Sequence, residues 1–494
     1  MSREQEIRNL RIQKIERLKE LGMEPYPDPA KTKPTATLKK VVDNFSQWEK
    51  DKKELKLVGR IMTKRGAGKI AFANIFDGTE NFQVVLQADI LGKEKMKIFD
   101  KLFDIGDFAN FSGTLFKTQK GQESLRVSDF QMAGKTLLPL PEKWHGLANK
   151  EEKYRKRYLD LISDKDSFER FKLRAKIISE IRKILDQEGF LEVETPILQN
   201  QASGAMAEVF KTHHNDYDLD LVLRISLEAE HKMIMAGGYP AVYEIGKNFR
   251  NEGSDSTHMQ EFTMIEWYKA YEGLEYNMNL TEKMLKQIAE QVVGKTKFKM
   301  ESASGEKVEI DFGKEWEKLE FNDLIRKYAD LDPEQASREE LENKALELGE
   351  DKNNIKKMSL GNILDSIWKK SARRKIIQPT WIMHYPGSLK PLAIQNGNGT
   401  AEVAQPVIAG FELSNHYAEQ VNPIKQRELL EEQLKAKKAG DNETMDMNTE
   451  FLEAMEHGMP PMTGTGIGID RLVSIFTEQN NLRDTIFFPL MKPE

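Results

Sequence analysis

Cysteine is absent from the 494 residues of this sequence. Its absence excludes disulfide scaffolds, thiolate zinc sites and cysteine nucleophiles, and it fits the reducing interior of the cytoplasm. Long apolar runs are also absent, since no stretch approaches the ~20 residues that span a membrane. The N-terminus MSREQEIRNLRIQKIERLK is charged from its third residue and lacks the apolar region of a secretory signal. These absences predict a cytoplasmic protein that has no membrane partner.

The usual sequence signatures of metal and nucleotide sites are missing as well. The eight histidines include no HExxH pair, and the adjacent His213 and His214 would face opposite sides of one strand. No G-x-x-x-x-G-K-[ST] loop is present. The glycines at 464, 466 and 468 do not match G-x-G-x-x-G, and the 26 residues after Gly468 are too few for a dinucleotide fold. If the protein uses ATP, it must bind it without a Walker loop.

Charge is divided unevenly along the chain. Residues 1–150 hold 28 Lys and Arg against 20 Asp and Glu, a net charge of +8, whereas the remaining residues hold 46 against 60, a net charge of −14. A basic N-terminal third on an acidic body suits a module that binds nucleic acid. Ordinary surface variation is an equal alternative, because this excess is modest for its length. The length exceeds that of one compact core and predicts two or three domains.

The N-terminal third predicts a helix followed by a small barrel. Residues 1–22 form an amphipathic basic helix that is either an arm for RNA or a packing helix. Between residues 50 and 140, five short strands are expected, with one helix between the third and the fourth. This order is typical of an OB-fold β-barrel, whose open face binds single-stranded nucleic acid. A barrel used only for assembly is the alternative, but the basic charge and Phe72 favour nucleic acid.

The rest of the chain predicts a larger α+β domain. Residues 141–167 are proline-marked and then strongly charged, which is typical of a linker. Residues 168–494 open with a long helix and continue with irregularly alternating strands and helices, including antiparallel hairpins near 208–225 and 242–270. Residues from about 320 to 375 lack strand patterns and predict a mainly helical insertion.

Three segments of the larger domain are candidates for a functional site. GFLEVETPIL (189–198) reads as a strand that ends at Pro196, for which a structural role is favoured. In AVYEIGKNFRNEGSDSTHMQEFTMIEWYKAY (241–271), a hairpin presents Arg250 and Glu252 on one side of the chain. A guanidinium suits a phosphate and a carboxylate can accept from an exocyclic amine, although a surface Arg–Glu hairpin is the simpler alternative. In GTGIGIDRLVSIF (464–476), the glycines permit close approach of a ligand or another surface, and Arg471 suits a phosphate or a base.

These three segments, in this order, resemble motifs 1, 2 and 3 of the class II aminoacyl-tRNA synthetases. The linker LLPLPEKWHGLANKEEKYRKRYLDLI, the barrel and THHNDYDLDLVLRIS further resemble the bacterial lysyl-tRNA synthetases of subclass IIb, over nearly the whole chain. The resemblance implies an antiparallel sheet that holds a bent ATP, an OB-fold that reads an anticodon, and a homodimer built partly on GFLEVETP. It implies a lysine–tRNA ligase that acts on ATP, L-lysine and tRNA(Lys), with Mg²⁺ bound beside the ATP.

By this resemblance, the second and third motifs hold the nucleotide. Arg250 would hold the α-phosphate and the substrate carboxylate, and Arg471 would cover the adenine and reach the γ-phosphate, so both are expected to be catalytic. The other expected ATP-binding residues are Glu252 and Phe262 at the adenine, His258 at the terminal phosphates, and Glu412 as a metal ligand. No general base is needed, because the carboxylate of the amino acid is already a nucleophile.

The choice of lysine rests on a concentration of carboxylates. Glu228, Glu266 and Glu419 match positions that surround the amino acid in the lysine enzymes, and several carboxylates in one closed pocket are costly unless a cation enters. Lysine supplies two ammonium groups. Glu228 is expected near the α-amino group, and Tyr268 with Glu419 near the ε-ammonium group. The resemblance adds to this lysine-binding set Gly204, Asn415 and Tyr417.

The barrel carries the expected anticodon-binding residues. By the same resemblance, Phe72, Gln83 and Glu123 match positions that stack on and hydrogen-bond the anticodon bases, and Arg65 would hold a nearby phosphate. A uridine-rich lysine anticodon suits one aromatic face with polar side chains around it.

Several positions depart from the family pattern. Met259 and Gln260 stand where the family usually has Asn-Pro, and NHYAEQVNP stands for NGFSELNDP, which introduces His416 and Tyr417. One of the two usual acidic metal ligands falls at Gln405, and the loss of one charge is expected to weaken Mg²⁺ binding. The stretch HYPGSLKPLAIQNGNG also departs from the usual acidic, serine-containing version.

These departures leave two alternatives to an active lysine–tRNA ligase. One is a related ligase that charges another amino acid or modifies a protein lysine, although such lysine-modifying paralogues generally lack the barrel. The other is a synthetase-like tRNA-binding protein with impaired catalysis, which Gln405, Met259 and His416 suggest. The presence of both arginines, Arg250 and Arg471, argues against it.

Overall fold

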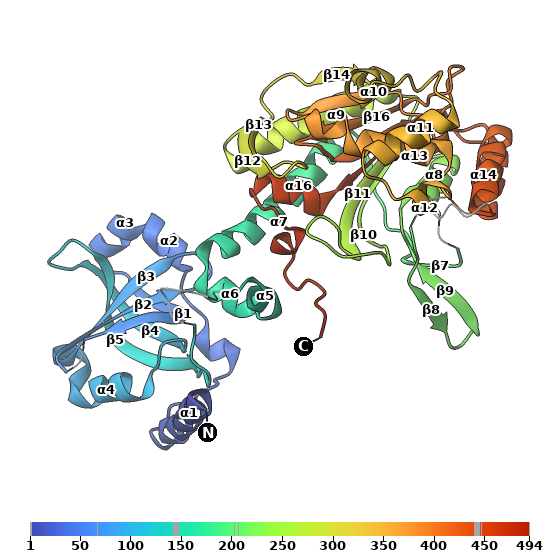
Figure 1. The fold of residues 1–494 in the computed structure, drawn as a ribbon. Helices are drawn as coiled ribbons and strands as arrows, with labels where there is room; N and C mark the ends of the chain where they lie inside the picture. The colour runs from blue at the N-terminus through green and yellow to red at the C-terminus, as the bar shows by residue number, and fades with distance from the viewer. Residues whose placement is uncertain are drawn as a thin grey trace. The chain divides into compact units, whose positions relative to one another are not determined.

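The chain forms two compact units in the computed structural model (Figure 1), one of Met1–Lys153 with Tyr158–Ser163 and one of Tyr154–Arg157 with Asp164–Glu494. The structure describes residues 2–66, 68–141, 147, 149–201, 203–205, 207–438, 445 and 447–493. Part of the predicted linker, residues 142–146 and 148, therefore lies outside the described residues. The rest of it includes α5 (Lys150–Arg155) and α6 (Arg157–Ser163). No helix formed by the described residues is long and apolar enough to cross a membrane.

The first unit contains a closed five-stranded barrel with the strand order β1-β2-β3-β5-β4. Its strands are β1 (Glu54–Arg65), β2 (Ile70–Phe76), β3 (Asn81–Gln87), β4 (Phe108–Lys117) and β5 (Glu123–Gly134). Alternate residues of β1, including Leu55, Leu57 and Ile61, point inward and are buried. Helix α4 (Ala88–Leu102) follows β3 and packs Met96 and Phe99 into the same core. The predicted OB-fold, with its helix between the third and fourth strands, is confirmed.

Helix α1 (Arg3–Glu20) packs against its own unit, which also includes α2 (Leu38–Asp43) and α3 (Phe45–Lys50). The Nη1 atom of the buried Arg11 donates to Thr136 Oγ1 at 2.8 Å and to the carbonyl oxygen of Leu138 at 2.9 Å. Lys14 Nζ lies 2.7 Å from a carboxylate oxygen of Asp104. Of the two predicted roles for this helix, the structure supports packing, because two of its basic side chains serve as anchors.

The second unit is built on a nine-stranded sheet with the order β14-β15-β16-β18-β19-β11-β10-β6, in which β17 also pairs with β16. The strands are β6 (Leu191–Glu192), β10 (Ala241–Phe249), β11 (Glu261–Ala270), β14 (Glu317–Glu320), β15 (Thr380–Met383), β16 (Val403–Ile408), β17 (Phe411–Glu412), β18 (Ser414–Ala418) and β19 (Met462–Gly468). The central pairs are antiparallel, and only the edge pairs β10–β6 and β14–β15 are parallel. The predicted α+β fold is confirmed.

Helices cover one face of this sheet and leave the other face for a site. Helices α7 (Lys165–Gln187), α9 (Leu274–Gln287) and α16 (Ile469–Phe476) pack on a core that includes Ile265 and Trp267 of β11. The side chains of Glu266 and Tyr268 therefore face the opposite side. Met235 of α8 (Glu228–Ala236) packs against Tyr268 on that second face. Helices α14 (Pro423–Lys438) and α15 (Thr449–Glu456) share a small hydrophobic core with α8.

The segment after β14 is helical and carries a core of its own. It consists of α10 (Phe321–Ala329), α11 (Arg338–Glu347), α12 (Lys352–Ile355) and α13 (Leu360–Lys370), packed around residues such as Trp368 and Tyr385. Two small sheets complete the unit: the hairpin β12 (Lys297–Glu301) with β13 (Lys307–Asp311), and the order β7 (Leu198–Gln199), β9 (Leu219–Leu223), β8 (Lys211–His214). Both predicted hairpins form, as β8–β9 and β10–β11.

The segment GFLEVETPIL differs from the single strand that its sequence predicted, because only the two-residue strands β6 and β7 form in it. Side-chain hydrogen bonds replace the strand ladder between them. The Thr195 backbone N–H and hydroxyl both donate to Glu244 Oε2, at 3.0 and 2.7 Å, and Arg224 Nη1 donates to Glu244 Oε1 at 2.7 Å. Glu244 thus fixes this segment to β10 through its side chain.

Candidate active site

Two adjoining cavities lie on the sheet face opposite α7, α9 and α16. Their volumes are about 420 Å³ and about 210 Å³. Both are lined by Arg250, Glu252, Glu412 and Asn415, so one ligand can extend from the smaller cavity into the larger. Strands β11, β16, β18 and β19 contribute lining residues because alternate side chains of a strand face the same side of a sheet, and Arg250 and Glu252 follow the end of β10.

All six residues predicted to bind ATP line the smaller cavity, namely Arg250, Glu252, His258, Phe262, Glu412 and Arg471. The guanidinium carbon of Arg250 lies 5.1 Å from the ring centre of Phe262. Arg471 Nη1 donates to the backbone oxygen of Glu412 at 2.6 Å. Burial lowers the pKa of Arg250 and of Arg471, and the nearby acids oppose that shift. Both arginines remain charged, so they are cations in a poorly hydrated site, which strengthens their attraction for phosphate.

His258 differs from these arginines because 64% of its side chain is exposed. Its Nδ1 lies 3.0 Å from Asp255 Oδ2, in the loop between β10 and β11. Burial opposes the ionisation of Asp255, but the Thr257 backbone N–H and the His258 ring together lower the pKa of Asp255 to about 2. Met259, which departs from the family pattern, lines the same cavity.

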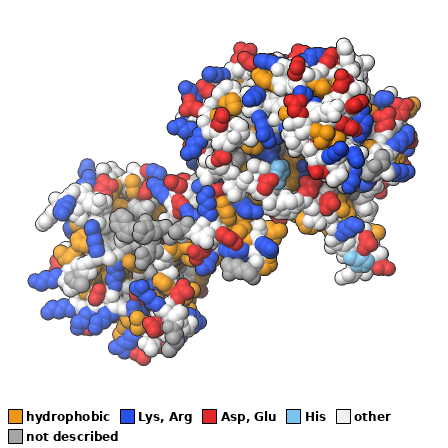
Figure 2. Space-filling model, in the orientation of Figure 1, with side chains coloured by type: hydrophobic (Ala, Val, Ile, Leu, Met, Phe, Trp, Pro, Cys, Tyr) orange, Lys and Arg blue, Asp and Glu red, His pale blue; other side chains and the backbone are white. Residues whose placement is uncertain are grey.

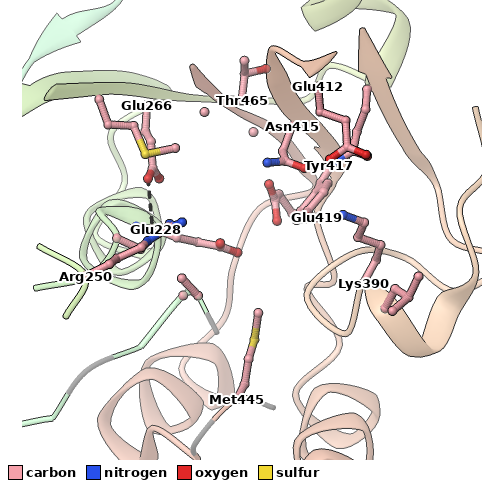
Figure 3. Close-up of a pocket in the computed structure, with 18 of the residues that line it drawn as sticks. Glu228, Arg250, Glu266, Lys390, Glu412, Asn415, Tyr417, Glu419, Met445 and Thr465 are labelled. Carbon is pink, nitrogen blue, oxygen red and sulfur yellow. Dashed lines mark hydrogen bonds between the residues drawn. The ribbon is translucent and has the colours of Figure 1, made fainter. Parts of the chain in front are cut away.

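All seven residues predicted to bind lysine line the larger cavity, namely Gly204, Glu228, Glu266, Tyr268, Asn415, Tyr417 and Glu419. In Figure 3, Glu228, Glu266 and Glu419 point towards a common space, with Arg250 at its edge. Burial raises the pKa of Glu266, and it also raises the pKa of Glu419 to about 8 although Lys232 opposes that shift. Acids this close disfavour one another's ionisation, and an entering cation would reverse that effect.

Lys232 is a component of this pocket that the sequence analysis missed. The side chain is fully buried, and its Nζ lies 2.7 Å from Glu228 Oε1 and 2.5 Å from Glu419 Oε2. Burial would lower the pKa of Lys232, but the two glutamates raise it to about 12. Glu266 is the third acid of this pocket. When an entering cation makes all three acids ionise, they and the ammonium of Lys232 leave two negative charges, which equals the number of ammonium groups on lysine. The signal was present, since Lys232 follows Glu228 by four residues on one helix.

The glycines of β19 make room for the acidic pocket. A Cβ atom on Gly464 would overlap Glu419 Oε1 and the ring of Tyr268, and one on Gly466 would lie 2.7 Å from Met264 Cε. The close approach predicted for this segment is therefore made by side chains of the protein itself, packed over the strand.

Helix α13 supplies a second set of residues that the sequence analysis missed. Asn362, Asp365 and Lys369 line the larger cavity, although they belong to the helical insertion. Their spacing puts three polar side chains on one face of a helix whose neighbours Ile363 and Ile367 are buried. This polar face was readable from the sequence, but its proximity to the pocket was not.

Comparison with known proteins agrees with this geometry. Residues 149–492 match the family model of tRNA synthetases class II (D, K and N), and residues 55–133 match that of the OB-fold nucleic acid binding domain. The chain belongs to the class II tRNA synthetases. A lysine–tRNA ligase of Clostridium novyi is 42% identical over 490 residues, which cover 98% of this chain and 94% of that relative. A lysine–tRNA ligase of Clostridium tetani is 40% identical over 503 residues, covering 100% and 98%.

In the barrel of this synthetase, three of the predicted anticodon residues lie side by side. The Arg65 guanidinium carbon is 5.2 Å from the Phe72 ring centre, and Arg65 Nη2 donates to Gln83 Oε1 at 3.2 Å. Gln83 is buried and its Nε2 donates to Ser124 Oγ at 2.8 Å, so both ends of its amide already have partners. Glu123 lies at the start of β5, 3.6 Å from Lys117 Nζ. Figure 2 shows Lys and Arg side chains along the exposed edge of this unit.

The predicted metal ligands of the synthetase, Glu412 and Gln405, both line the larger cavity. Glu412 Oε1 accepts from Trp368 Nε1 at 3.0 Å. Gln405 Nε2 donates to Asn415 Oδ1, and Gln405 Oε1 is buried without a hydrogen-bond partner among the described residues. Over the same part of the chain, no three acidic or histidine side chains form a metal-binding group. One carboxylate and one open amide oxygen fit Mg²⁺ that takes its other ligands from substrate phosphates and water.

His416, a departure from the family pattern that suggested impaired catalysis, lies away from both cavities of the synthetase. It is fully buried on the opposite face of β18 from Asn415 and Tyr417, and it lines neither cavity. Its Nε2 is 2.8 Å from Ser414 Oγ and its Nδ1 is 2.8 Å from Thr465 Oγ1. Burial lowers the pKa of His416 to about 3, so the imidazole is neutral. The doubt that this residue raised about catalysis was misplaced.

Proposed function

We propose that this synthetase is a cytoplasmic, ATP-dependent lysine–tRNA ligase. One observation carries the proposal: a pocket that holds three acids, Glu228, Glu266 and Glu419, against the single ammonium of Lys232 adjoins a cavity lined by Arg250 and Arg471. The acidic pocket suits a substrate that carries two ammonium groups. The arginines suit the carboxylate of that substrate and a polyphosphate. L-Lysine and ATP together meet these demands, in agreement with the relatives named lysine–tRNA ligase.

In the first step, a carboxylate oxygen of lysine attacks the α-phosphorus of ATP. The bond from that phosphorus to the bridging oxygen breaks, so pyrophosphate leaves and lysyl-adenylate forms. Arg250 lies where the two cavities meet, and it would neutralise the negative charge that gathers on the α-phosphate. Glu252 and Phe262 would hold the adenine, with Arg471 over its other face. The enzyme's contribution is alignment and charge, because no proton has to be removed from the nucleophile.

In the second step, a hydroxyl at the 3′-end of tRNA(Lys) attacks the carbonyl carbon of the adenylate. The ester bond to tRNA forms, AMP leaves, and the hydroxyl proton is released. In the barrel, Phe72 would stack on an anticodon base and Arg65 would hold a phosphate, because an aromatic face beside a guanidinium is a common single-strand binding surface. Gln83 would have to exchange its present partners to read a base.

Mg²⁺ would be held by Glu412 and the open oxygen of Gln405, together with ATP phosphates. When bound, it supplies positive charge to the polyphosphate.

We further propose a homodimer that uses the segment around β6 and β7. Leu191, Ile197 and Leu198 are 47%, 41% and 48% exposed, which groups three large apolar side chains on one short segment. Sedimentation velocity should give twice the chain mass of 56.9 kDa. A Leu198→Glu substitution should shift the protein towards the monomer, whereas Ile424→Glu, at a 72% exposed position of α14, should not. A monomeric wild-type protein at micromolar concentration would contradict the proposal.

ATP–pyrophosphate exchange across the twenty amino acids, followed by tRNA charging, tests the function. Exchange that depends on lysine and charging of tRNA(Lys) are expected. Exchange with a different amino acid and none with lysine would refute the choice of substrate, while leaving the adenylating chemistry intact.

A synthetase-like tRNA-binding protein is the second candidate, and Gln405 is the observation that favours it. With one carboxylate in place of two, Mg²⁺ binding could be too weak for turnover. The absence of exchange with any amino acid, together with retained tRNA binding, would support this candidate.

A further inference from the structure

Lys390 brings to the larger cavity a positive charge that the site described so far does not use. It follows the short helix Gly387–Leu389, and its side chain runs beside two tyrosines. The Nζ atom lies 5.2 Å from the ring centre of Tyr385 and 5.8 Å from that of Tyr417. Figure 3 shows the ammonium directed into the cavity on the side of Glu412. Both rings attract the ammonium, which favours this position for the charge.

Among the described residues, this ammonium has no carboxylate within 4.0 Å. The two acids that act on it from farther away are engaged with other groups. Asp365 pairs with Lys369 at 2.5 Å, and Glu412 accepts from Trp368. Burial lowers the pKa of Lys390, and these acids only partly oppose the shift. Its charge is thus only weakly compensated by the protein.

Lys390 is half-buried, and two lysines that the structure describes as fully buried show a different arrangement. Lys135 Nζ lies 2.5 Å from Asp104 and 2.7 Å from Asp107, and Lys232 likewise lies between two carboxylates. A buried charge is costly unless it is paired. An ammonium that the protein leaves open towards a cavity therefore indicates a ligand that supplies the negative charge.

The chemistry of the cavity narrows the choice of that ligand. The ammonium groups of a lysine substrate would repel Lys390, and Arg250 is available for the substrate carboxylate. Gln405 lines the same cavity and carries a neutral amide where the family has an acid. Glu412 is therefore the one predicted metal ligand here that can offset the positive charge of Lys390. A lysine ammonium binds a phosphate oxygen as a point charge.

Building on the proposed ligase function, we propose that Lys390 binds a phosphate oxygen of ATP. It thereby carries part of the neutralisation that Mg²⁺ bound at Glu412 and Gln405 would otherwise supply. The Lys390 ammonium is a cation that is part of the protein, and it replaces part of the charge of a dissociable Mg²⁺. The affinity for ATP therefore depends less on free Mg²⁺ than it would without Lys390.

Calorimetric titration of the full-length protein with ATP, without lysine, tests this proposal across Mg²⁺ concentrations from zero to saturating. A Lys390→Met substitution should weaken ATP binding about tenfold at zero Mg²⁺, because a charge-assisted bond is lost. The loss should shrink as Mg²⁺ rises. The affinity for lysine alone should stay within about twofold of wild type, because Lys390 does not pair with the acids of the lysine pocket.

Two further variants serve as controls. Lys390→Arg keeps the charge and should retain most of the ATP affinity at zero Mg²⁺. Lys375→Met removes an exposed lysine that lines neither cavity, and it should change nothing. In the double variant K390M/Q405E, the added carboxylate should restore ATP binding at saturating Mg²⁺ but not at zero Mg²⁺. This result would show that Lys390 and a metal held at position 405 neutralise the same phosphate charge.

Three results would overturn the proposal: unchanged ATP affinity of Lys390→Met at zero Mg²⁺, a loss that falls on lysine binding instead, or a loss of the same size at every Mg²⁺ concentration. Circular dichroism checks the fold of each variant, and Lys390→Gln replaces Lys390→Met if the latter does not fold. Failure of the wild-type protein to activate lysine would refute the proposed function, whereas the ATP titrations would still decide the role of Lys390.

Discussion

Glu419 experiences opposing electrostatic effects within the acidic pocket. Burial and the neighbouring Glu228 raise its pKa, whereas Lys232, 2.5 Å away, lowers it, and the result is a pKa of about 8. Without a ligand, the carboxyl group is therefore largely protonated at neutral pH. An ε-ammonium group beside it would favour the ionised form, so ligand binding and proton release are coupled.

Lysine binding at pH 7 should release roughly one proton from Glu419, because the free carboxyl is mostly protonated and the bound one is ionised. The sign follows from the raised pKa: affinity should fall as the pH drops below about 8 and should level off above it. Calorimetry in buffers of different ionisation enthalpy measures the released proton. Glu419→Gln should abolish the release, and equal heats in all buffers at pH 7 for wild type would contradict the assignment.

Replacing Lys232 by Met should lower the free energy of unfolding by about 3–5 kcal/mol and abolish lysine binding, since Glu228 and Glu419 would lose their buried partner. Chemical denaturation and lysine titration measure the two effects. Lys283→Met, which breaks an exposed pair with Glu188, is the matched control and should cost about 1 kcal/mol or less. Lysine binding that survives in a folded Lys232→Met protein would refute the proposed charge balance.

The sequence predicted the types of residue in the site better than their partners. The carboxylates and arginines were found because each lies in a recognisable segment. Lys232 was missed because a lysine four residues after a glutamate is ordinarily a solvated surface pair. Only burial distinguishes the two cases, and burial depends on long-range packing that spacing does not reveal.

At the scale of elements, β18 explains both a success and an error. Alternation along this strand places Asn415 and Tyr417 in the cavity and His416 in the core behind it. The sequence predicts that neighbouring side chains of β18 point to opposite faces of the sheet. Which of the two faces borders the cavity depends on how β18 pairs with β19. A substitution behind the cavity was therefore taken as a sign of impaired catalysis.

A Gly464→Ala substitution should raise the KM for lysine more than tenfold, because the added methyl would displace the Glu419 and Tyr268 side chains that lie over this glycine. The affinity for ATP should change by less than about threefold, since the smaller cavity lacks these residues. Exchange kinetics with varied lysine and varied ATP separate the two effects. Gly273→Ala, with no atom within 4 Å of the added Cβ, should leave both unchanged. Equal changes in both would indicate a general loss of structure.

At the scale of the molecule, the barrel and the catalytic sheet have separate hydrophobic cores. Each core was predictable, because strand order in the first unit and the ordered motifs in the second are local features. The position of the insertion helix α13 beside the cavity was not predictable, because no local sequence pattern encodes which distant segments meet.

A Phe72→Ala substitution should raise the KM for tRNA about tenfold or more by removing a stacking surface worth about 1–3 kcal/mol per base. Lysine-dependent ATP–pyrophosphate exchange should be unaffected, because Phe72 and the cavities belong to different units. Ile70→Ala, at an exposed apolar position two residues earlier on β2, tests whether the effect is specific to the aromatic ring. Loss of exchange in the Phe72 variant would show that the barrel also influences activation.

The ammonium of Lys232 also bears on inhibition. Lys232 already compensates the charge of one of the three acids. A monoamine of similar length would therefore leave one carboxylate without a partner, whereas a five-carbon diamine would pair with both remaining carboxylates. Such a diamine lacks the carboxylate that Arg250 would hold, so it could occupy the pocket without ever being activated.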